Sequence, residues 1–434
     1  MIKIETSTLT WIASRFLIVV AGLNLNGLFL MLFNVNQVFS VPIMIASLYL
    51  IWQGGGRALS DSTNALLALA IITYLLFAYL YSTTQGLEAP IQFAVTYISS
   101  ILLIVAAASF ASGRNSLQGI ADDLRLLKTV LIISCLSAWF SPLFRTVFTV
   151  DLSDADRSAG FFGNPNETGM LAVVTVAIIL SHPSRSKVLN LAHFIIAVGA
   201  IVLTFSKASL VTLILAVFVY GVRHARPLLT LGPAALAAFV ALSTGLIVDF
   251  DLVELTSYQR ERLENVASLL KGEITSETTT GRTDVWEIGW QRIEENILAG
   301  SGIGTFHNMV DGVRDEDDEN WVGVHNTYLM VWGEAGLVAF LLLAIANAQL
   351  VYRALRSTFS EFALLYVVVL EIDMMAAHNV LGLRFHNLLT GMVIGTLMWQ
   401  QESKSATLRG TSGRGGSEAD MPARGLPASR PAKR

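Results

Sequence analysis

Residues 325–351 read HNTYLMVWGEAGLVAFLLLAIANAQLV, a long apolar run that opens with three polar residues. About 20 predominantly apolar residues are enough for an α-helix to cross the hydrocarbon core of a bilayer. Similar runs recur along the 434-residue chain, which is 53% hydrophobic and 14% charged, whereas soluble domains carry about 25% charged residues. The sequence therefore predicts an all-α polytopic membrane protein.

Twelve segments of the chain are expected to span the membrane. They are 11–33, 38–53, 63–81, 90–110, 125–142, 167–181, 188–204, 208–222, 228–248, 325–351, 361–381 and 384–400. The single cysteine, Cys135, lies inside one of them, so no intramolecular disulfide is expected. The first run is long and lacks a cleavage site of small residues, which predicts an uncleaved span.

The placement of Lys and Arg predicts that both termini lie in the cytoplasm, because cytoplasmic loops of membrane proteins are rich in these residues. In this orientation ten basic residues fall in cytoplasmic loops and four in the short outer loops. The ten are Arg57, Arg114, Arg125, Lys128, Arg185, Lys187, Arg223, Arg226, Arg353 and Arg356; the four are Arg145, Arg157, Lys207 and Arg384.

Four parts follow from this pattern: nine spans in 1–248, a large periplasmic loop in 249–324, three spans in 325–400, and a basic cytoplasmic tail in 401–434. The tail is rich in Gly, Ser, Ala, Pro and Arg and is expected to be disordered, because it has few large apolar groups. The loop is expected to be structured, since Trp286, Trp290, Ile293 and Ile297 recur at helical spacing. A second helix is expected at 252–270.

The loop and its neighbours supply the candidate site residues. From Asp249 to Glu319 there are 17 acidic and 6 basic residues, so Arg282 is a rare cation there. Arginine offers a planar donor fork that suits phosphate, although a surface ion pair would also explain it. Lys207 lies in a tight outer turn and needs either a carboxylate or a bound anion as partner. His325 begins a span on the outer side and is either an interface residue or a group that exchanges a proton.

Several motifs together resemble the O-antigen ligase and polysaccharide polymerase superfamily of bacterial membrane glycosyltransferases. These motifs are Gly160-Phe161-Phe162-Gly163-Asn164-Pro165-Asn166, Ser206-Lys207, Gly281-Arg282-Thr283 with Trp286, Asn296 to Phe306, and His325-Asn326-Thr327-Tyr328-Leu329 with Glu334-Ala335-Gly336. Each motif is short, and it is their order before and after a large loop that carries the resemblance.

The resemblance implies a polytopic, metal-independent, inverting glycosyltransferase of the inner membrane that needs no cofactor. Its donor would be a saccharide on a polyprenyl diphosphate, and its acceptor a glycan or lipid-linked saccharide at the periplasmic face. By similarity, Arg282 and Lys207 would bind the diphosphate, and His325 would orient or deprotonate the acceptor hydroxyl. Asn166, Asn326 and Trp286 are candidate saccharide-binding residues. Membrane lipids and other polysaccharide assembly proteins are the remaining expected partners, and no nucleic acid is expected.

Two alternatives to a polymerase of exopolysaccharide or O-antigen units stay open. A ligase that transfers finished glycan to lipid A-core would share the fold and the chemistry. Ligases of this family usually carry arginine where this chain has Lys207, which favours the polymerase. A secondary transporter or flippase would also fit twelve spans, but it should show related halves and broken helices near the midplane, and no repeat is evident in the sequence.

Overall fold

The computed structural model describes residues 6–35, 37–84, 91–114, 117–141, 157–224, 282–306, 323–357, 360–377 and 379–412, together with a few residues between 260 and 268. Within these ranges the chain is helical, with no strand. The helices are α1 (Thr6–Gly22), α2 (Leu25–Phe33), α3 (Ser40–Gln53), α4 (Ser62–Thr84), α5 (Ile91–Ser112), α6 (Leu117–Trp139), α8 (Pro165–Ser181), α9 (Lys187–Leu203), α10 (Lys207–Arg223), α14 (Arg282–Glu295), α15 (Thr327–Arg356), α16 (Glu361–Ala376) and α17 (Arg384–Ser412), with short 3₁₀ turns η1 (Arg57–Ser60), η2 (Gly160–Phe162) and η3 (Val380–Gly382).

Helices occupy eleven of the twelve segments expected to span the membrane, and the twelfth, 228–248, lies outside the described residues. By length and composition, α4, α5 and α15 could each cross a bilayer, and the bent pair of α1 and α2 would add a fourth span. Three further helices, α3, α8 and α9, are apolar but shorter. The protein is therefore an all-helical membrane protein, and the count of twelve spans stays a prediction.

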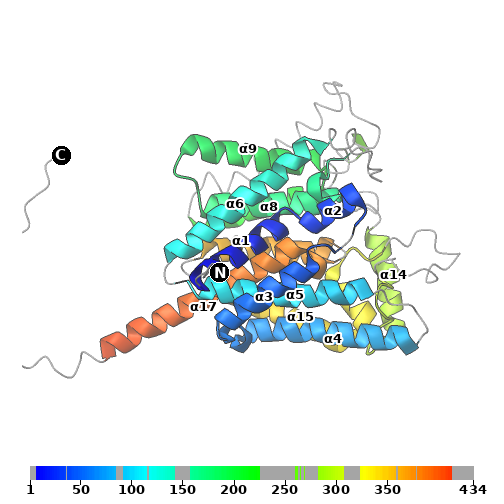
Figure 1. The fold of residues 1–434 in the computed structure, drawn as a ribbon. Coiled ribbons are helices and arrows are strands. Elements are labelled where there is room, and N and C mark those ends of the chain that lie inside the picture. The colour runs from blue at the N-terminus through cyan, green and yellow to red at the C-terminus, as the bar shows by residue number, and fades with distance from the viewer. Residues whose placement is uncertain are drawn as a thin grey trace, which may run out of the picture.

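Most helices run along a common direction, with α14 lying across one end of the bundle and α17 reaching beyond the other (Figure 1). The helix α17 packs along α5 at short range, because glycines face small residues at this contact. A Cβ atom at Gly391 would lie 2.2 Å from the carbonyl oxygen of Ile104, and one at Gly395 would lie 2.5 Å from that of Ala108. Glycines four residues apart allow close approach of helices in membranes, where lipid removes most of the hydrophobic drive for association.

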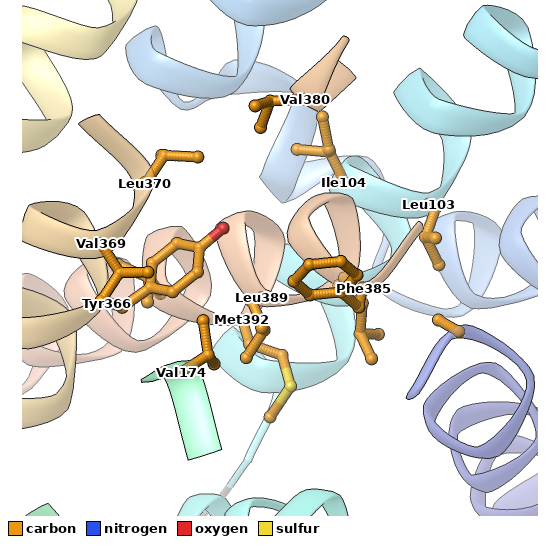
Figure 2. Packing of buried hydrophobic residues seen from close by; sticks show 14 of the residues in the cluster. Leu103, Ile104, Val174, Tyr366, Val369, Leu370, Val380, Phe385, Leu389 and Met392 are labelled. Atoms are coloured by element: carbon orange, nitrogen blue, oxygen red, sulfur yellow. The ribbon is translucent and has the colours of Figure 1, made fainter. Parts of the chain in front are cut away.

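The centre of the bundle is packed with aromatic and branched side chains. Tyr366 on α16 and Phe385 on α17 are almost completely buried, and Figure 2 shows them among residues from neighbouring helices, including Ile104 of α5 and Val174 of α8. Such packing fixes the relative positions of α5, α8, α16 and α17, whose ends form the candidate site described below.

The first expected span, 11–33, differs from the structure, because the chain bends by 55° between α1 and α2. The break falls at Asn24, whose φ of 47° places it in the left-handed region. Asparagine enters this region more readily than most residues, and its side-chain amide donates to the carbonyl of Phe161. A hydropathy pattern does not detect this bend, because both halves are apolar.

The helix α15 is broken at Gly336, where φ is 80°. The segment 297–303, which follows α14, fills the break. The amides of Ser301 and Gly302 donate to the carbonyls of Gly333 and Glu334, at 2.7 and 3.0 Å, and the amide of Leu337 donates to the carbonyl of Ile297 at 3.0 Å. Irregular backbone at membrane depth is tolerated where protein groups satisfy it, so this segment explains how an interrupted helix is stable there.

Glu334 completes this junction. Its side chain is fully buried and accepts hydrogen bonds from the hydroxyl of Tyr74 on α4 and from the amide of Phe306, the latter at 3.0 Å. The amide of Ile303 in turn lies within hydrogen-bond distance of Ser82 Oγ and of the Ala78 carbonyl, both on α4. The end of the large loop is thus fixed between α4 and α15.

The predictions for the polar loop and for the C-terminal tail have different outcomes in the structure. The predicted amphipathic helix of the loop corresponds to α14, while the helix expected at 252–270 lies almost wholly outside the described residues. The tail expected to be disordered from 401 is helical as far as Ser412. The physical reason is local, since residues 401–408 contain neither Gly nor Pro and extend the preceding helix.

Candidate functional site

A cavity of about 380 Å³ lies at the end of the bundle where several helices begin. Its polar lining comes from α5, from α8 and its cap, from α16, from His325 shortly before α15, and from the η3 turn and its cap. The lining residues are Phe93, Thr96, Asn164, Asn166, Glu167, Met170, Ala208, His325, Asp373, Ala376, Ala377, Asn379, Gly382 and Leu383. The mixture of amides, carboxylates and a few apolar side chains is typical of a pocket for a small polar ligand.

The N-terminal ends of five helices meet at this cavity. The first turns of α5, α8 and α10 contribute lining residues, His325 lies two residues before the start of α15, and Leu383 immediately precedes α17. Each helix start presents unpaired amides and a partial positive charge. The convergence therefore favours an anionic group close to the cavity, even though none of the described residues that line it is Lys or Arg.

Asn166 is held in place by a buried arginine. Arg157, which is 3% exposed, donates through Nη2 to Oδ1 of Asn166 at 2.7 Å and through Nε to the carbonyl of Thr204 at 2.8 Å. Asn164 caps α8, its Oδ1 accepting from the amide of Asn166 at 2.9 Å. The predicted saccharide residue Asn166 thus reaches the cavity in an orientation that two neighbours determine.

Lys207 begins α10 beside the cavity. The turn before it has Phe205 in the left-handed region, with φ of 48°, and Ser206 as the helix cap. The turn packs tightly on α8, since a Cβ atom at Gly169 would lie 2.9 Å from Thr204 Oγ1 and 3.1 Å from Ser206 Cβ. Ala208, the next residue after Lys207, lines the cavity. A lysine at a helix start adds its own charge to the positive end of the helix.

His325 lines the same cavity, and its backbone is held on both sides. Before it, the amide of Val324 donates to the carbonyl of Phe306 at 3.0 Å. After it, Thr327 Oγ1 donates to the carbonyl of Ala377 at 3.0 Å. His325 itself has φ of 41°, a left-handed conformation that costs energy for a residue with a Cβ atom. Strained residues cluster at functional sites, where the surrounding structure holds them.

The other predicted residues lie elsewhere. Asn326 is the cap of α15, and its Oδ1 accepts from the amides of Tyr328 and Leu329, at 3.0 and 3.1 Å, so this oxygen is already engaged. Trp286 on α14 packs against the hydrophobic core and is not among the residues that line the cavity. Arg282 is the first residue of α14, and the position of its side chain lies outside the description.

Reasoning from the sequence missed several residues at the cavity. Glu167, Asp373 and Asn379 line it, and Arg157 orients Asn166 from behind. The available signals were the position of Arg157 among the few basic residues of the outer loops and the position of Asp373 within the expected span 361–381. Among the residues the structure describes, no group of three His, Cys, Asp or Glu side chains is arranged to hold a metal ion.

The fold and the cavity define a membrane protein with a polar site at one end of a helical bundle. Residues 192–344 match the family model described as O-antigen ligase. This segment therefore belongs to the O-antigen ligase and polysaccharide polymerase superfamily, and the resemblance seen in the sequence motifs is confirmed for it. It contains Lys207, Arg282, Trp286, His325 and Asn326. No curated protein matches the chain by sequence. The family implies a ligase or polymerase that acts on lipid-linked glycans.

Proposed function

We propose that this protein is an inner-membrane glycosyltransferase that polymerises exopolysaccharide or O-antigen repeat units from polyprenyl-diphosphate-linked saccharides. The observation that carries the proposal is the cavity in which His325 and Asn166 meet beside Lys207, at the ends of five helices. Two of these three residues, His325 and Lys207, lie in the segment that matches the O-antigen ligase family.

The diphosphate of the donor would lie at the Lys207 turn. As the glycosidic bond breaks, negative charge grows on the leaving diphosphate, and fixed cations and helix starts stabilise it. Lys207 supplies a point charge at the first residue of α10. Arg282, the first residue of α14, would supply a planar donor fork. These groups carry the reaction without a bound metal.

The saccharide would occupy the cavity, and His325 would act on the acceptor. The acceptor oxygen attacks the anomeric carbon on the face opposite the diphosphate, a new C–O bond forms as the bond to the diphosphate breaks, and the configuration inverts. The hydroxyl proton passes to His325, which is a suitable base when neutral. Asn166, held by Arg157, would bind a saccharide hydroxyl.

The contacts at the other end of the bundle support a periplasmic position for the cavity. Cations that the sequence predicts to be cytoplasmic bind there. Arg353 at the end of α15 pairs with Asp61 before α4 at 2.9 Å, and Lys128 on α6 donates to the carbonyl of His182 after α8 at 2.8 Å. The helices α8 and α15 both begin at the cavity, so these contacts mark the opposite face of the protein.

The test uses a deletion strain of the source organism. The strain is complemented, at matched membrane levels, with the wild type, with His325→Ala, or with His193→Ala as a control histidine on α9, away from the cavity. Extracellular polysaccharide and lipopolysaccharide are then sized. We expect long glycan from the wild type and the control but not from His325→Ala. Equal restoration by His325→Ala would refute the assigned role of the histidine, and restoration of neither glycan by the wild type would refute the function.

The runner-up is a ligase that transfers glycan to lipid A-core, a function that is also compatible with the matching family, described as O-antigen ligase. The same experiment separates the two functions. A polymerase restores the length of a glycan, whereas a ligase restores its attachment to lipid A-core and leaves the length of the lipid-linked glycan unchanged.

A further inference from the structure

A buried carboxylate–histidine pair forms part of the wall of the same cavity. Asp373 lies in the last turn of α16 and His386 in the first turn of α17, and each is 1% exposed. Their Oδ2 and Nε2 atoms are 2.6 Å apart. Buried charged or polar groups require such partners, because burial without a hydrogen bond is costly. The mechanism described above uses neither residue.

The imidazole of His386 is fixed from its other side. Its Nδ1 atom lies 3.3 Å from the hydroxyl of Tyr366, which also donates to the backbone carbonyl of His386 at 2.8 Å. Thr390 Oγ1 lies 2.8 Å from the same hydroxyl. Tyr366 is itself held in the apolar packing of α16 and α17 (Figure 2). His386 therefore has one orientation, in which Nε2 faces Asp373.

One carboxylate oxygen of Asp373, Oδ1, is not used by His386. Asp373 lines the cavity together with His325 and Asn166, and its Oδ1 atom has no hydrogen-bond partner in the part of the chain that the structure describes. A carboxylate accepts through both oxygens, and His386 occupies Oδ2. A hydrogen-bond donor on a ligand that enters the cavity would bind Oδ1.

The chemical groups in the cavity wall favour one kind of hydrogen-bond donor. Two carboxylates, Glu167 and Asp373, line the cavity, and Lys and Arg are absent from its described lining. Both carboxyl groups offer oxygens that accept hydrogen bonds, so a sugar hydroxyl that donates to Asp373 fits this wall better than phosphate, whose oxygens also accept. Phe93 and Met170 add apolar surface for the C–H faces of a sugar ring.

We propose that Asp373 binds a saccharide hydroxyl through Oδ1 and that His386 is a positioning residue, which holds the carboxylate so that Oδ1 is left for the saccharide. The inference rests on the proposed glycosyltransferase function and assigns part of its saccharide subsite. His386 is not among the residues that line the cavity, so it acts through Asp373.

The experiment measures KM and kcat of the full-length protein in nanodiscs. The substrate is the polyprenyl-diphosphate-linked saccharide that accumulates in the deletion strain. Four variants are compared with the wild type: Asp373→Asn, His386→Leu, His386→Gln, and Thr390→Val as a control that disturbs the same buried cluster without touching Asp373. In Asp373→Asn, the side-chain amide oxygen can keep the hydrogen bond to His386. The N–H groups of the amide then replace Oδ1, the acceptor that is left for the saccharide.

We expect Asp373→Asn and His386→Leu to raise KM by roughly tenfold or more, as expected for losing one hydrogen bond to a charged group. His386→Gln should stay within about threefold of the wild type, because its Nε2 can still donate to Oδ2. Thr390→Val should leave KM unchanged. An unchanged KM in Asp373→Asn would overturn the inference, as would an equal rise in KM in Thr390→Val.

The outcomes separate this inference from the function on which it rests. An inactive wild type would refute the glycosyltransferase itself. An active wild type with an unchanged KM in Asp373→Asn would refute only the saccharide contact. If His386→Leu does not fold, Asp373→Asn and His386→Gln decide, since both keep the size and polarity of the buried groups.

Discussion

The guanidinium of Arg157 donates to Asn166 at 2.7 Å, and a buried cation thereby orients an amide in the wall of the cavity. The same guanidinium donates to the carbonyl of Thr204, three residues before Lys207. One side chain thus fixes the start of α8 relative to the turn before α10. The geometry between the proposed saccharide contact and the proposed phosphate contact depends on this arginine.

Replacing Arg157 with Lys should therefore impair the enzyme without preventing insertion. Lysine keeps the charge but lacks the fork that reaches two acceptors at once, and each hydrogen bond that involves a charged group contributes about 1.5–3 kcal/mol. We expect glycan formation to fall by roughly tenfold at equal membrane levels. Arg185→Lys, at an exposed position, is the control. Wild-type product from Arg157→Lys would show that the fork has no role.

Lys207 should contribute to glycan formation through its positive charge. Lys207→Ala removes the cation at the start of α10, and we expect at least a tenfold loss of glycan formation, since one fixed cation near a leaving group is worth several kcal/mol. Lys207→Arg should keep most of the activity. Chain-length analysis of both variants in the deletion strain checks this. Full activity of Lys207→Ala would remove the residue from the diphosphate site.

Gly336→Ala should strongly destabilise the protein. With φ of 80° and ψ of −178°, this residue lies in a region that is essentially restricted to glycine and costs about 1–3 kcal/mol for a residue with a Cβ atom, and that atom would lie 2.0 Å from the carbonyl oxygen of Leu298. Gly55 has a similar φ of 62° but open space around it. Thermal unfolding in detergent should show a much larger drop in Tm for Gly336→Ala than for Gly55→Ala. Equal drops would mean that backbone strain alone matters.

Glu334 should contribute to stability through its two donors. Glu334→Leu removes the acceptor of the Tyr74 hydroxyl proton and of the Phe306 amide in a buried place, at about 1–3 kcal/mol for each. Tyr74→Phe removes one donor and should cost less. The Tm of the purified protein and its monodisperse fraction would measure both effects. A larger effect of Tyr74→Phe than of Glu334→Leu would contradict this account of the junction.

Local patterns in the sequence predicted the helices well. Apolar runs marked the positions of the helices from α1 to α10 and from α15 to α17, and the spacing of Trp286 and Trp290 predicted α14. Hydrophobicity and periodicity are properties of residues that are neighbours in the sequence, so they can be recognised without knowledge of the fold. The bend at Asn24 and the break at Gly336 could not be predicted in this way, because they depend on contacts with Phe161 and Leu298.

The candidate site was predicted in part for a similar reason. Motif order identified His325 and Asn166, which do share a cavity, and Lys207 beside it. Asn326 stood next to His325 in the same motif, yet its oxygen caps α15. The pairing of Asp373 with His386 joins two helices, and a sequence gives no sign of which polar residues on different helices will face each other.

The break in α15 also has a consequence for how the protein matures. The amide of Leu337 and the carbonyls of Gly333 and Glu334 bond to segment 297–302, and the amide of Ile303 bonds to α4. Helices α4 and α15 must therefore both be in the membrane before the loop can close on them. His325 follows Val324, whose amide bonds to the carbonyl of Phe306, so the histidine can take its final place only once the loop has closed.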